Sequence, residues 1–391
     1  MMRTPWKKMT RYLQVMNDNS RFGGEKSMEV LSHEWGVRGT AGVSFASALK
    51  LQGVDVSIGG RPILNKMDLE LVPGEIVCLL GESGSGKSTV LRVAAGIQEI
   101  SAGQVLVNGK TVSKPGYSVS PDQRGVGLMF QDFALFPHLS LLDNVCFGLG
   151  RMERKQAVKQ ARNALSRVGL LERQDDFPHM LSGGQQQRLA LARTFAPRPG
   201  ILMLDEPFSS LDARLRENVR SQTLAILRET RATTIIVTHD PEEAMVLGDR
   251  IALLRDGKVA QIDSAAQIYR SPVDLQTARF FSPLTEIEGM VNAGMVSTPL
   301  GAVPAPGYKD GDKVIVAVRP VGALDMVRES KGVRARVLSK REALGFDIFE
   351  IGVHNIDAPI SIRAPSDHDL EPGKDIFVTL KPEHVLIFEY V

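Results

Sequence analysis

The sequence predicts an α/β fold with a largely parallel sheet, followed by a small all-β barrel. Between about residues 49 and 283, short apolar runs alternate with stretches of helical period, which is typical of a parallel sheet covered by helices. From about Leu284, short strands separated by Gly, Pro and Asp turns take over, and the helical period almost disappears. We therefore expect an α/β domain over 49–283 and a β-barrel domain over 284–391.

Composition excludes several classes of protein. A chain of 391 residues should hold about two to three domains, and its hydrophobic content of 43% and charged content of 24% are ordinary for a globular protein. The net charge of +2 does not favour nucleic acid or an anionic surface. Cys78 and Cys146 lie far apart within apolar runs, which indicates buried thiols rather than a metal site. No uncharged apolar run approaches the ~20 residues that span a bilayer.

Residues 1–48 differ from the rest of the chain. The segment Met1–Lys8 is basic, but no apolar stretch follows it to make a secretory signal. A basic arm that touches lipid is one interpretation. A disordered leader, or a start codon assigned too early, is the other, and we favour it because Gly36–Ser47 is small and polar.

One glycine-rich motif organises the α/β region. It follows an apolar run, Ile76–Leu80, and precedes a helix-like stretch, Val90–Ala95. Its members are Gly81, Glu82, Ser83, Gly84, Ser85, Gly86, Lys87, Ser88 and Thr89. The pattern G-x-x-x-x-G-K-[ST] between a strand and a helix predicts a phosphate loop.

The residue types of this motif suit a nucleotide phosphate chain. Glycines let successive N–H groups point at one anion, and the following helix offers the positive end of its dipole. Lys87 can reach the outer phosphates, and Ser88 can offer its hydroxyl to Mg²⁺. The alternative is a flexible glycine-serine turn, but Lys followed by Ser at this spacing favours nucleotide binding.

Polar side chains end three further apolar strands. Gln131 follows Gly127–Phe130, Asp205 and Glu206 end the run from Ile201, and His239 ends the run from Thr234. Ligands of α/β sheets bind at the carboxyl ends of strands, so we expect these residues to converge on the phosphate loop.

Each of these residues has a candidate role and an ordinary alternative. Asp205 can hold Mg²⁺ while Glu206 orients the attacking water. His239 can sense the γ-phosphate and fix Glu206, and Gln131 can bind Mg²⁺ and the water through its amide. Taken singly, two adjacent acids are often only solvated, and a Gln or His at a strand end is often structural. After a phosphate loop, the catalytic interpretation is favoured.

Between these strands, residues 133–180 read as an inserted helical subdomain. Residues 151–170 carry a helical period whose apolar side is formed by Ala157, Ala161, Ala164, Leu165 and Val168. A second helix then opens at Leu181–Arg188. Ser182, Gly183 and Gly184 at its start make another N-terminus suited to an anion.

With these motifs in hand, residues 49–283 resemble the ATP-binding subunit of an ABC transporter. Leu181–Gln185 is similar to that family's signature motif, Asp205–Glu206 to its magnesium and catalytic-glutamate motif, and Ser209–Asp212 to the loop that follows. Gln131 and His239 are similar to its Q-loop and switch histidine. The C-terminal module resembles the OB-like barrel of maltose, sulfate, polyamine and ferric-iron importers. The stretch from the phosphate loop to Gln131, together with Phe136–Leu139, looks most like the ferric-iron group.

The resemblance implies an ATPase that works as a homodimer. Each ATP would lie between one chain's phosphate loop and the Ser182, Gly183, Gly184 and Gln185 of the other chain. The subunit would sit peripherally on the cytoplasmic face of the inner membrane, bound to transmembrane permease subunits that work with an external solute-binding protein. Phe133, Leu135 and Phe136 would line a groove for a permease helix, or simply belong to the core.

Two positions depart from the family pattern. Ile58 stands where an aromatic residue usually stacks on adenine, and Val321 stands where an acid is expected after Pro320. The first departure leaves open what supports the adenine. The second puts a regulatory role of the barrel in doubt.

Other functions compete with ferric-iron import. A sulfate, polyamine, sugar, thiamine or phosphonate importer shares the same motifs. A non-transport ABC ATPase of DNA repair would have a long coiled coil between Gln131 and Ser182, where only about 50 residues lie. A barrel that grips nucleic acid should be basic, but residues 284–391 hold 12 Lys and Arg against 16 Asp and Glu. We therefore expect no nucleic acid partner.

Overall fold

The computed structural model describes residues 42–209, 211, 213–320, 324–326, 332–343, 345–364 and 370–390. Most of the expected leader, 1–48, lies outside these residues. Its last part, 42–48, has no helix or strand but is bonded to the α/β region: Ser44 N donates to Thr230 O at 2.8 Å, and Ser47 N donates to Gly200 O at 3.1 Å. Ordered contacts therefore begin before the expected boundary at Leu49.

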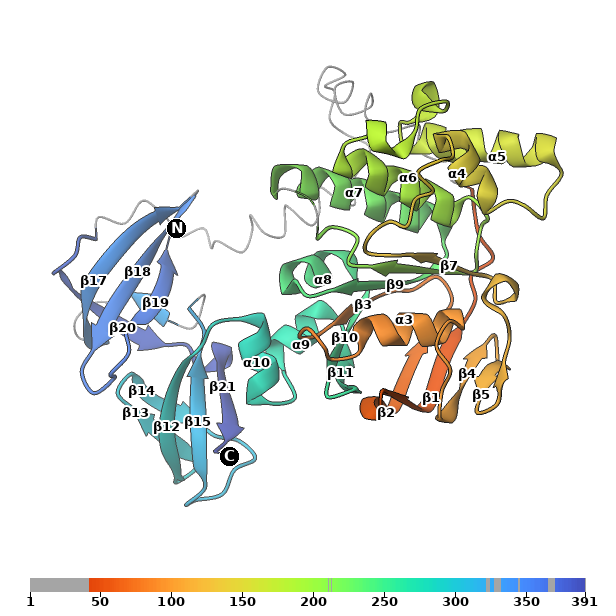
Figure 1. The fold of residues 1–391 in the computed structure, drawn as a ribbon. Helices are drawn as coiled ribbons and strands as arrows, with labels where there is room; N and C mark the ends of the chain where they lie inside the picture. Colours follow the sequence, from red (N-terminus) through yellow and green to blue (C-terminus); the bar gives the residue numbers. More distant parts are fainter. Residues whose placement is uncertain are drawn as a thin grey trace.

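A largely parallel sheet forms the centre of the α/β region (Figure 1). Its strands are β3 (Ile76–Leu80), β7 (Val126–Met129), β8 (Ile201–Asp205), β9 (Thr233–Thr238), β10 (Arg250–Arg255) and β11 (Lys258–Asp263). They lie in the order β11-β10-β3-β9-β8-β7, and every neighbouring pair is parallel except the hairpin of β10 and β11. The predicted α/β class is confirmed.

A separate antiparallel sheet takes up the remaining strands before residue 120. They are β1 (Leu49–Ile58), β2 (Arg61–Leu71), β4 (Ala102–Val107), β5 (Lys110–Lys114) and β6 (Tyr117–Ser118). The predicted hairpin at Asn108-Gly109 joins β4 to β5, and both turn residues have positive φ, 50° and 75°, as such turns require.

Each face of the central sheet packs against a different layer. The side chains of strand β3 alternate between the two faces. Those of Ile76, Cys78 and Leu80 belong to one apolar core, and those of Val77 and Leu79 belong to the other. The antiparallel sheet and helix α3 (Lys87–Ala95) cover the second face (Figure 1). Both Cys78 and Cys146 are buried and free, as expected.

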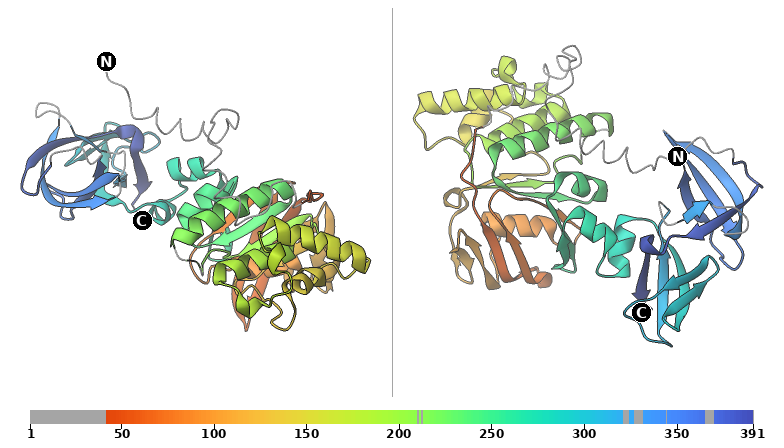
Figure 2. Two further views of the ribbon diagram at one scale, coloured as in Figure 1. Left: turned by 90° about the horizontal axis from the view of Figure 1, so that it is seen from above. Right: turned by 180° about the vertical axis from the view of Figure 1, so that it is seen from behind.

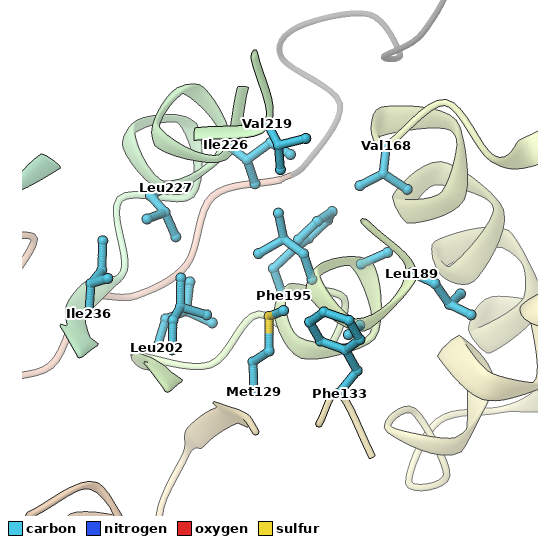
Figure 3. Close-up of a cluster of buried hydrophobic side chains, with 14 of the residues drawn as sticks. Met129, Phe133, Val168, Leu189, Phe195, Leu202, Val219, Ile226, Leu227 and Ile236 are labelled. Atoms are coloured by element: carbon cyan, nitrogen blue, oxygen red, sulfur yellow. The ribbon is translucent and has the colours of Figure 1, made fainter. Parts of the chain in front are cut away.

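Helices cover the first face of the central sheet. They are α4 (Leu141–Phe147), α5 (Arg154–Arg167), α6 (Gly183–Phe195) and α7 (Ala213–Thr230). The apolar side predicted for α5 is buried, although the helix is shorter than the predicted 151–170. Figure 3 shows the shared core, in which Phe133 and Met129 meet Phe195 and Leu189 of α6. The inserted helical subdomain therefore shares one core with the helices that follow it.

The C-terminal region is built from strands, as predicted. They are β12 (Thr285–Asn292), β13 (Met295–Thr298), β14 (Gly301–Pro304), β15 (Lys313–Val318), β16 (Leu324–Met326), β17 (Val333–Ala343), β18 (Phe346–Val353), β19 (Ile360–Ala364), β20 (Asp375–Leu380) and β21 (Val385–Glu389). Within the described residues these strands form two antiparallel sheets, β14-β13-β12-β15-β21 and β16-β20-β17-β18-β19. One core lies between the sheets, which fits an OB-like barrel.

Short helices complete the chain and join its two parts. They are α8 (Pro241–Leu247), α9 (Ala265–Arg270), α10 (Leu275–Phe281) and the 3₁₀ turns η1 (Pro121–Gln123), η2 (Leu171–Arg173), η3 (Pro178–Met180) and η5 (Pro382–His384). Figures 1 and 2 show α10 beside β15 and β21. At this seam Ala278 packs with Ala317 and Phe388, and the buried Arg319 lies with its guanidinium carbon 3.8 Å from the ring centroid of Tyr269.

Candidate nucleotide site

The phosphate loop connects β3 to α3 at the carboxyl edge of the central sheet. Gly81, Gly84 and Gly86 have φ of 156°, 83° and 103°, which L-residues with a Cβ rarely adopt. Space is also restricted, because a Cβ on Gly86 would lie 2.9 Å from Leu64 Cδ2 and one on Gly81 would lie 2.3 Å from the carbonyl oxygen of Leu254. Only glycine fits these two positions without moving β2 or β10.

Lys87 is buried at the start of α3, with its ammonium group turned back to the loop. Its Nζ donates to the carbonyl oxygens of Gly81 and Glu82, both at 2.8 Å. Burial lowers the pKa of Lys87, and the nearby carboxylates Glu206 and Asp205 partly oppose this shift. The lysine thus stabilises the shape of the phosphate loop and places a positive charge inside the cradle that Gly81–Thr89 form.

Ser88 and Asp205 bring two oxygen donors together. Ser88 Oγ donates to Asp205 Oδ1 at 3.1 Å, although the two residues lie 117 positions apart. Burial raises the pKa of the Asp205 carboxyl, and the bond from Ser88 opposes the shift. Ser85 Oγ is also buried and has no hydrogen-bond partner among the described residues. Thr89, the last residue of the motif, is buried in α3.

Glu206 leaves the sheet in an uncommon conformation. It follows β8 with φ of 44°, and its N–H donates to Val237 O at 3.1 Å. Its Oε2 accepts from Gln131 Nε2 at 3.3 Å and lies 3.4 Å from Nδ1 of His239. The ends of β7, β8 and β9 therefore bring these three side chains together, as predicted.

The residues predicted around Ser182 lie in a group of their own. Ser182 and Gln185 form a capping box at the start of α6: Ser182 Oγ accepts from Gln185 N at 3.4 Å, and Ser182 N donates to Gln185 Oε1 at 3.0 Å. Arg173 Nη1 also donates to Gln185 Oε1 at 3.0 Å. No Cβ contact within 4 Å restricts Gly183. These bonds are made within the helical layer and not with the phosphate loop of the same chain.

Apart from Ser209 and His239, the residues that share a cavity with Glu206 were not predicted as site residues. A small cavity of about 50 Å³ is lined by Glu206, Ser209, Arg216, Thr238, His239, Asp240 and Glu243. Glu243 is buried on α8, and its Oε2 accepts from Thr238 Oγ1 at 2.8 Å. Burial raises the pKa of Glu243. The only sequence signal for Glu243 is its position four residues after His239, on a helix that Asp240 caps.

A larger cavity, of about 200 Å³, lies against the phosphate loop. It is lined by Gly81–Ser85, Leu253–Asp256, Gln276 and Phe280. Ile58, the residue at the expected adenine position, is 46% exposed at the end of β1. Its side chain presents apolar surface to solvent there, and the question of what supports the adenine stays open.

Comparison with known proteins identifies the family. The family described as ABC transporter matches residues 64–209. The Fe(3+) ions import ATP-binding protein FbpC of Streptomyces avermitilis is 38% identical, over 87% of this chain and 97% of that protein. The chain belongs to the ATP-binding subunits of ABC transporters. It is therefore an ATPase, and the cradle at Gly81–Thr89 belongs to an ATP-binding cassette.

Other relatives of this ABC subunit agree with the assignment. The spermidine/putrescine import ATP-binding protein PotA of Oleidesulfovibrio alaskensis is 36% identical, over 84% of this chain and 88% of that protein. A solved dimeric structure of the ATP-binding cassette MJ0796, bound to ADP and Pi after hydrolysis, is 31% identical with a TM-score of 0.50. That match covers 56% of this chain and 98% of the MJ0796 chain.

Proposed function

We propose that this ABC subunit hydrolyses ATP to drive the import of ferric iron through partner membrane subunits. The likeness to the FbpC of S. avermitilis over nearly the whole of both chains carries the proposal. FbpC proteins of Streptomyces coelicolor and Haemophilus influenzae, 40% and 37% identical, support the same solute. Sulfate, polyamine and sugar are the alternatives, because CysA, PotA and GlcV proteins have 38%, 36% and 31% identity.

In this proposal the loop Gly81–Thr89 receives the phosphate chain of ATP. Its left-handed glycines turn backbone N–H groups inward, and α3 adds the positive end of its dipole. Lys87 exchanges its two carbonyl acceptors for phosphate oxygens, which satisfy its charge better. Ser85 Oγ, buried and without a described partner, gains a phosphate oxygen as acceptor.

The oxygen donors beside the loop fit Mg²⁺. Among the described residues no group of three or more His, Cys, Asp or Glu could hold a metal alone. Mg²⁺ at nucleotide sites needs only one or two protein oxygens, because phosphates and waters supply the rest. Ser88 Oγ and Asp205 Oδ1 would hold it, with the Gln131 amide nearby. When bound, Mg²⁺ neutralises charge on the phosphates.

Glu206 is the proposed residue that orients the attacking water. Its left-handed backbone turns the carboxylate toward Gln131 and His239, so both of these side chains hold it in one position. The side chain of His239 is 60% exposed, which leaves it free to contact the γ-phosphate of a bound nucleotide. Preorganisation of this kind lowers the barrier because little reorganisation is left for the reaction.

A second copy of the chain completes each ATP site in this proposal. The N-terminus of α6 makes its hydrogen bonds within the helical layer, and Ser182 and Gly183 are exposed there, so another molecule can reach them. The capping box fixes that N-terminus, and its glycines allow close approach by phosphates. The dimeric state of the ADP-bound MJ0796 cassette supports a homodimer.

The surface around Phe136 and Phe147 is the proposed docking site for the permease. Their ring centroids lie 4.4 Å apart, and Phe147 is 64% exposed. Of the aromatic residues expected there, Phe133 is instead buried in the core. No described helix is both long and apolar enough to cross a bilayer. We therefore propose peripheral attachment at the cytoplasmic face of the inner membrane, with an external solute-binding protein delivering the solute to the permease.

Uptake measurements test the solute. Cells carrying only the Glu206→Gln form would be given labelled ferric iron, sulfate, polyamines and sugars in parallel, with Glu242→Gln as the control because Glu242 is an exposed neighbouring carboxylate. We expect loss of iron uptake alone. Loss of another solute would overturn ferric iron but keep the importer. Unchanged uptake of the whole panel would overturn the importer itself.

A further inference from the structure

Arg193, in the last turn of α6, holds the segment that follows Gln131. Its Nη2 donates to the carbonyl oxygen of Phe133 and its Nη1 to that of Ala134, both at 2.7 Å. The same guanidinium lies over the ring of Phe136, 5.4 Å from the centroid. One side chain from α6 therefore contacts three residues of the segment that follows Gln131: Phe133, Ala134 and Phe136.

The segment held by Arg193 has an uncommon backbone. Phe133 and Ala134 both have positive φ, 61° and 44°, and neither is glycine. Two successive left-handed residues point their carbonyl oxygens to one side, where a single fork of N–H donors can reach both. Without a donor these carbonyls would lose their bonds, and the segment would relax toward ordinary right-handed or extended backbone.

The left-handed turn also sets the directions in which the side chains of Phe133 and Gln131 point. It carries the Phe133 ring into the core beside Phe195 (Figure 3), and it leaves Gln131 outside, with Nε2 3.3 Å from Glu206 Oε2. Phe133 N donates to Phe130 O at 2.9 Å, which closes the turn around Gln131 and Asp132. Burial lowers the pKa of Arg193 while the nearby Asp132 opposes the shift, so the guanidinium stays charged.

We infer that Arg193 is the positioning residue for Gln131. It holds the Gln131 amide near Glu206 by donating hydrogen bonds to the carbonyl oxygens of the two left-handed residues, Phe133 and Ala134. Because Arg193 lies on the 13-residue helix that Ser182 caps, it makes the position of Gln131 depend on where that helix sits. The ends of this connection are roughly 16 Å apart along α6. A shift of the helix on ATP contact by its N-terminus would move the Gln131 amide of the same chain.

The inference rests on the proposed role of Gln131 in hydrolysis, so the two are tested together. The purified full chain would be assayed for ATP turnover as wild type, Arg193→Gln, Gln131→Ala and the double variant. We expect Arg193→Gln to lower kcat about tenfold with KM within about twofold, as for other residues that orient a ligand. The double variant should match Gln131→Ala within about twofold, since the arginine acts through the glutamine.

Each failure has a different signature. Full turnover in Gln131→Ala would overturn the proposed role of Gln131. Reduced turnover in Gln131→Ala with multiplied losses in the double variant would overturn the inference alone. Arg162→Gln is the matched control, because Arg162 is an exposed arginine of the same layer on α5. It should leave turnover unchanged.

A measurement without nucleotide separates positioning from general damage. Hydrogen exchange of backbone amides in Arg193→Gln should rise at least about tenfold over 131–136, while α6 and β8 keep the protection of the wild type. Uniform loss of protection would indicate a merely structural role and contradict the inference. Arg193→Lys keeps the positive charge but has no forked pair of N–H donors. Compared with Arg193→Gln, it should therefore recover more of the stability of the fold than of the ATP turnover.

Discussion

The Oε2 atom of Glu206 lies 3.4 Å from Nδ1 of His239, although the two residues end different strands. Parallel pairing of β8 with β9 brings them together, because Asp205 is in register with Val237, Glu206 follows Asp205, and His239 lies two residues after Val237. The carboxylate is thus held by sheet geometry and not by a flexible loop. The contribution of the Glu206 carboxylate to hydrolysis can therefore be measured with a substitution that changes little else, Glu206→Gln.

Glu206→Gln should retain ATP binding and lose nearly all hydrolysis. The amide keeps the shape of the side chain but removes the charge that orients water, which should lower kcat by about 100-fold or more. Turnover and ATP affinity of the purified full chain check this expectation, with Glu242→Gln as the exposed control. Turnover at the native rate would show that Glu206 does not have the role given to it.

Lys87→Ala should abolish nucleotide binding. The variant loses the charge that meets the phosphates, and it also frees the carbonyl groups of Gly81 and Glu82 that Nζ holds at 2.8 Å. Titration with labelled ATP is the measurement. Lys110→Ala, at an exposed lysine of the antiparallel sheet, should bind as the wild type does. An unchanged affinity in Lys87→Ala would remove the phosphate-loop assignment.

Asp274 should contribute stability that disappears in acid. The bond from Arg255, together with the bond that caps α10 through Thr277 N at 2.7 Å, lowers the pKa of Asp274 to about 2. A carboxyl with a lowered pKa in the folded state stabilises the protein above its unfolded pKa, near 3.8, and loses this effect as pH falls toward 2. The window therefore runs from about pH 5 down to 2.

Asp274→Asn measures that contribution. Asparagine keeps the cap but not the charge, so its cost at pH 7 should be about 1 kcal/mol after allowance for solvent screening. Urea unfolding at pH 7 and at pH 3.5 should show the difference from wild type shrinking at the lower pH. A difference that stays constant or grows in acid would contradict the assignment of the effect to this carboxylate.

Arg319→Met should weaken the seam between the cassette and the barrel. Arg319 is buried against Tyr269 and donates to the Tyr269 carbonyl oxygen, so its removal should cost about 2 kcal/mol. Thermal unfolding of the full chain is the measurement. Arg363→Met is the matched control, since Arg363 lies over Phe346 at 5.2 Å but is exposed. Equal effects of the two changes would mean that the seam gains nothing from Arg319.

The sequence was sufficient where one local signal determined the structure. Alternating and apolar runs predicted the strands, and the glycine motif predicted the turn between β3 and α3. The sequence could not divide the strands between the parallel and antiparallel sheets, because alternation reports which side of a strand is buried and not which strand pairs with it. That division depends on contacts between distant segments, such as β1 with β4.

The side-chain relationships in the site were less accessible from sequence. Apolar character alone left Phe133 as either groove or core, and only its left-handed backbone, held by Arg193, turns the ring inward. Glu243 was missed because an acid on a helix is usually solvated, and its burial depends on Thr238 behind it. Such side-chain contacts depend on how helices and strands pack against each other. The spacing of residues along the sequence does not show this.

The strand order also affects how the protein can be made. Strand β3 lies between β9 and β10, and the N–H of Ile76 bonds to Asp249 Oδ2, 173 positions further along the chain. During synthesis the glycine-rich loop therefore emerges long before its sheet neighbours do. Contacts of such long sequence separation slow folding, so the growing chain must keep the apolar residues of β3 from aggregating until β9 and β10 arrive. A fragment that stops before them would have the nucleotide-binding motif without the sheet that shapes it.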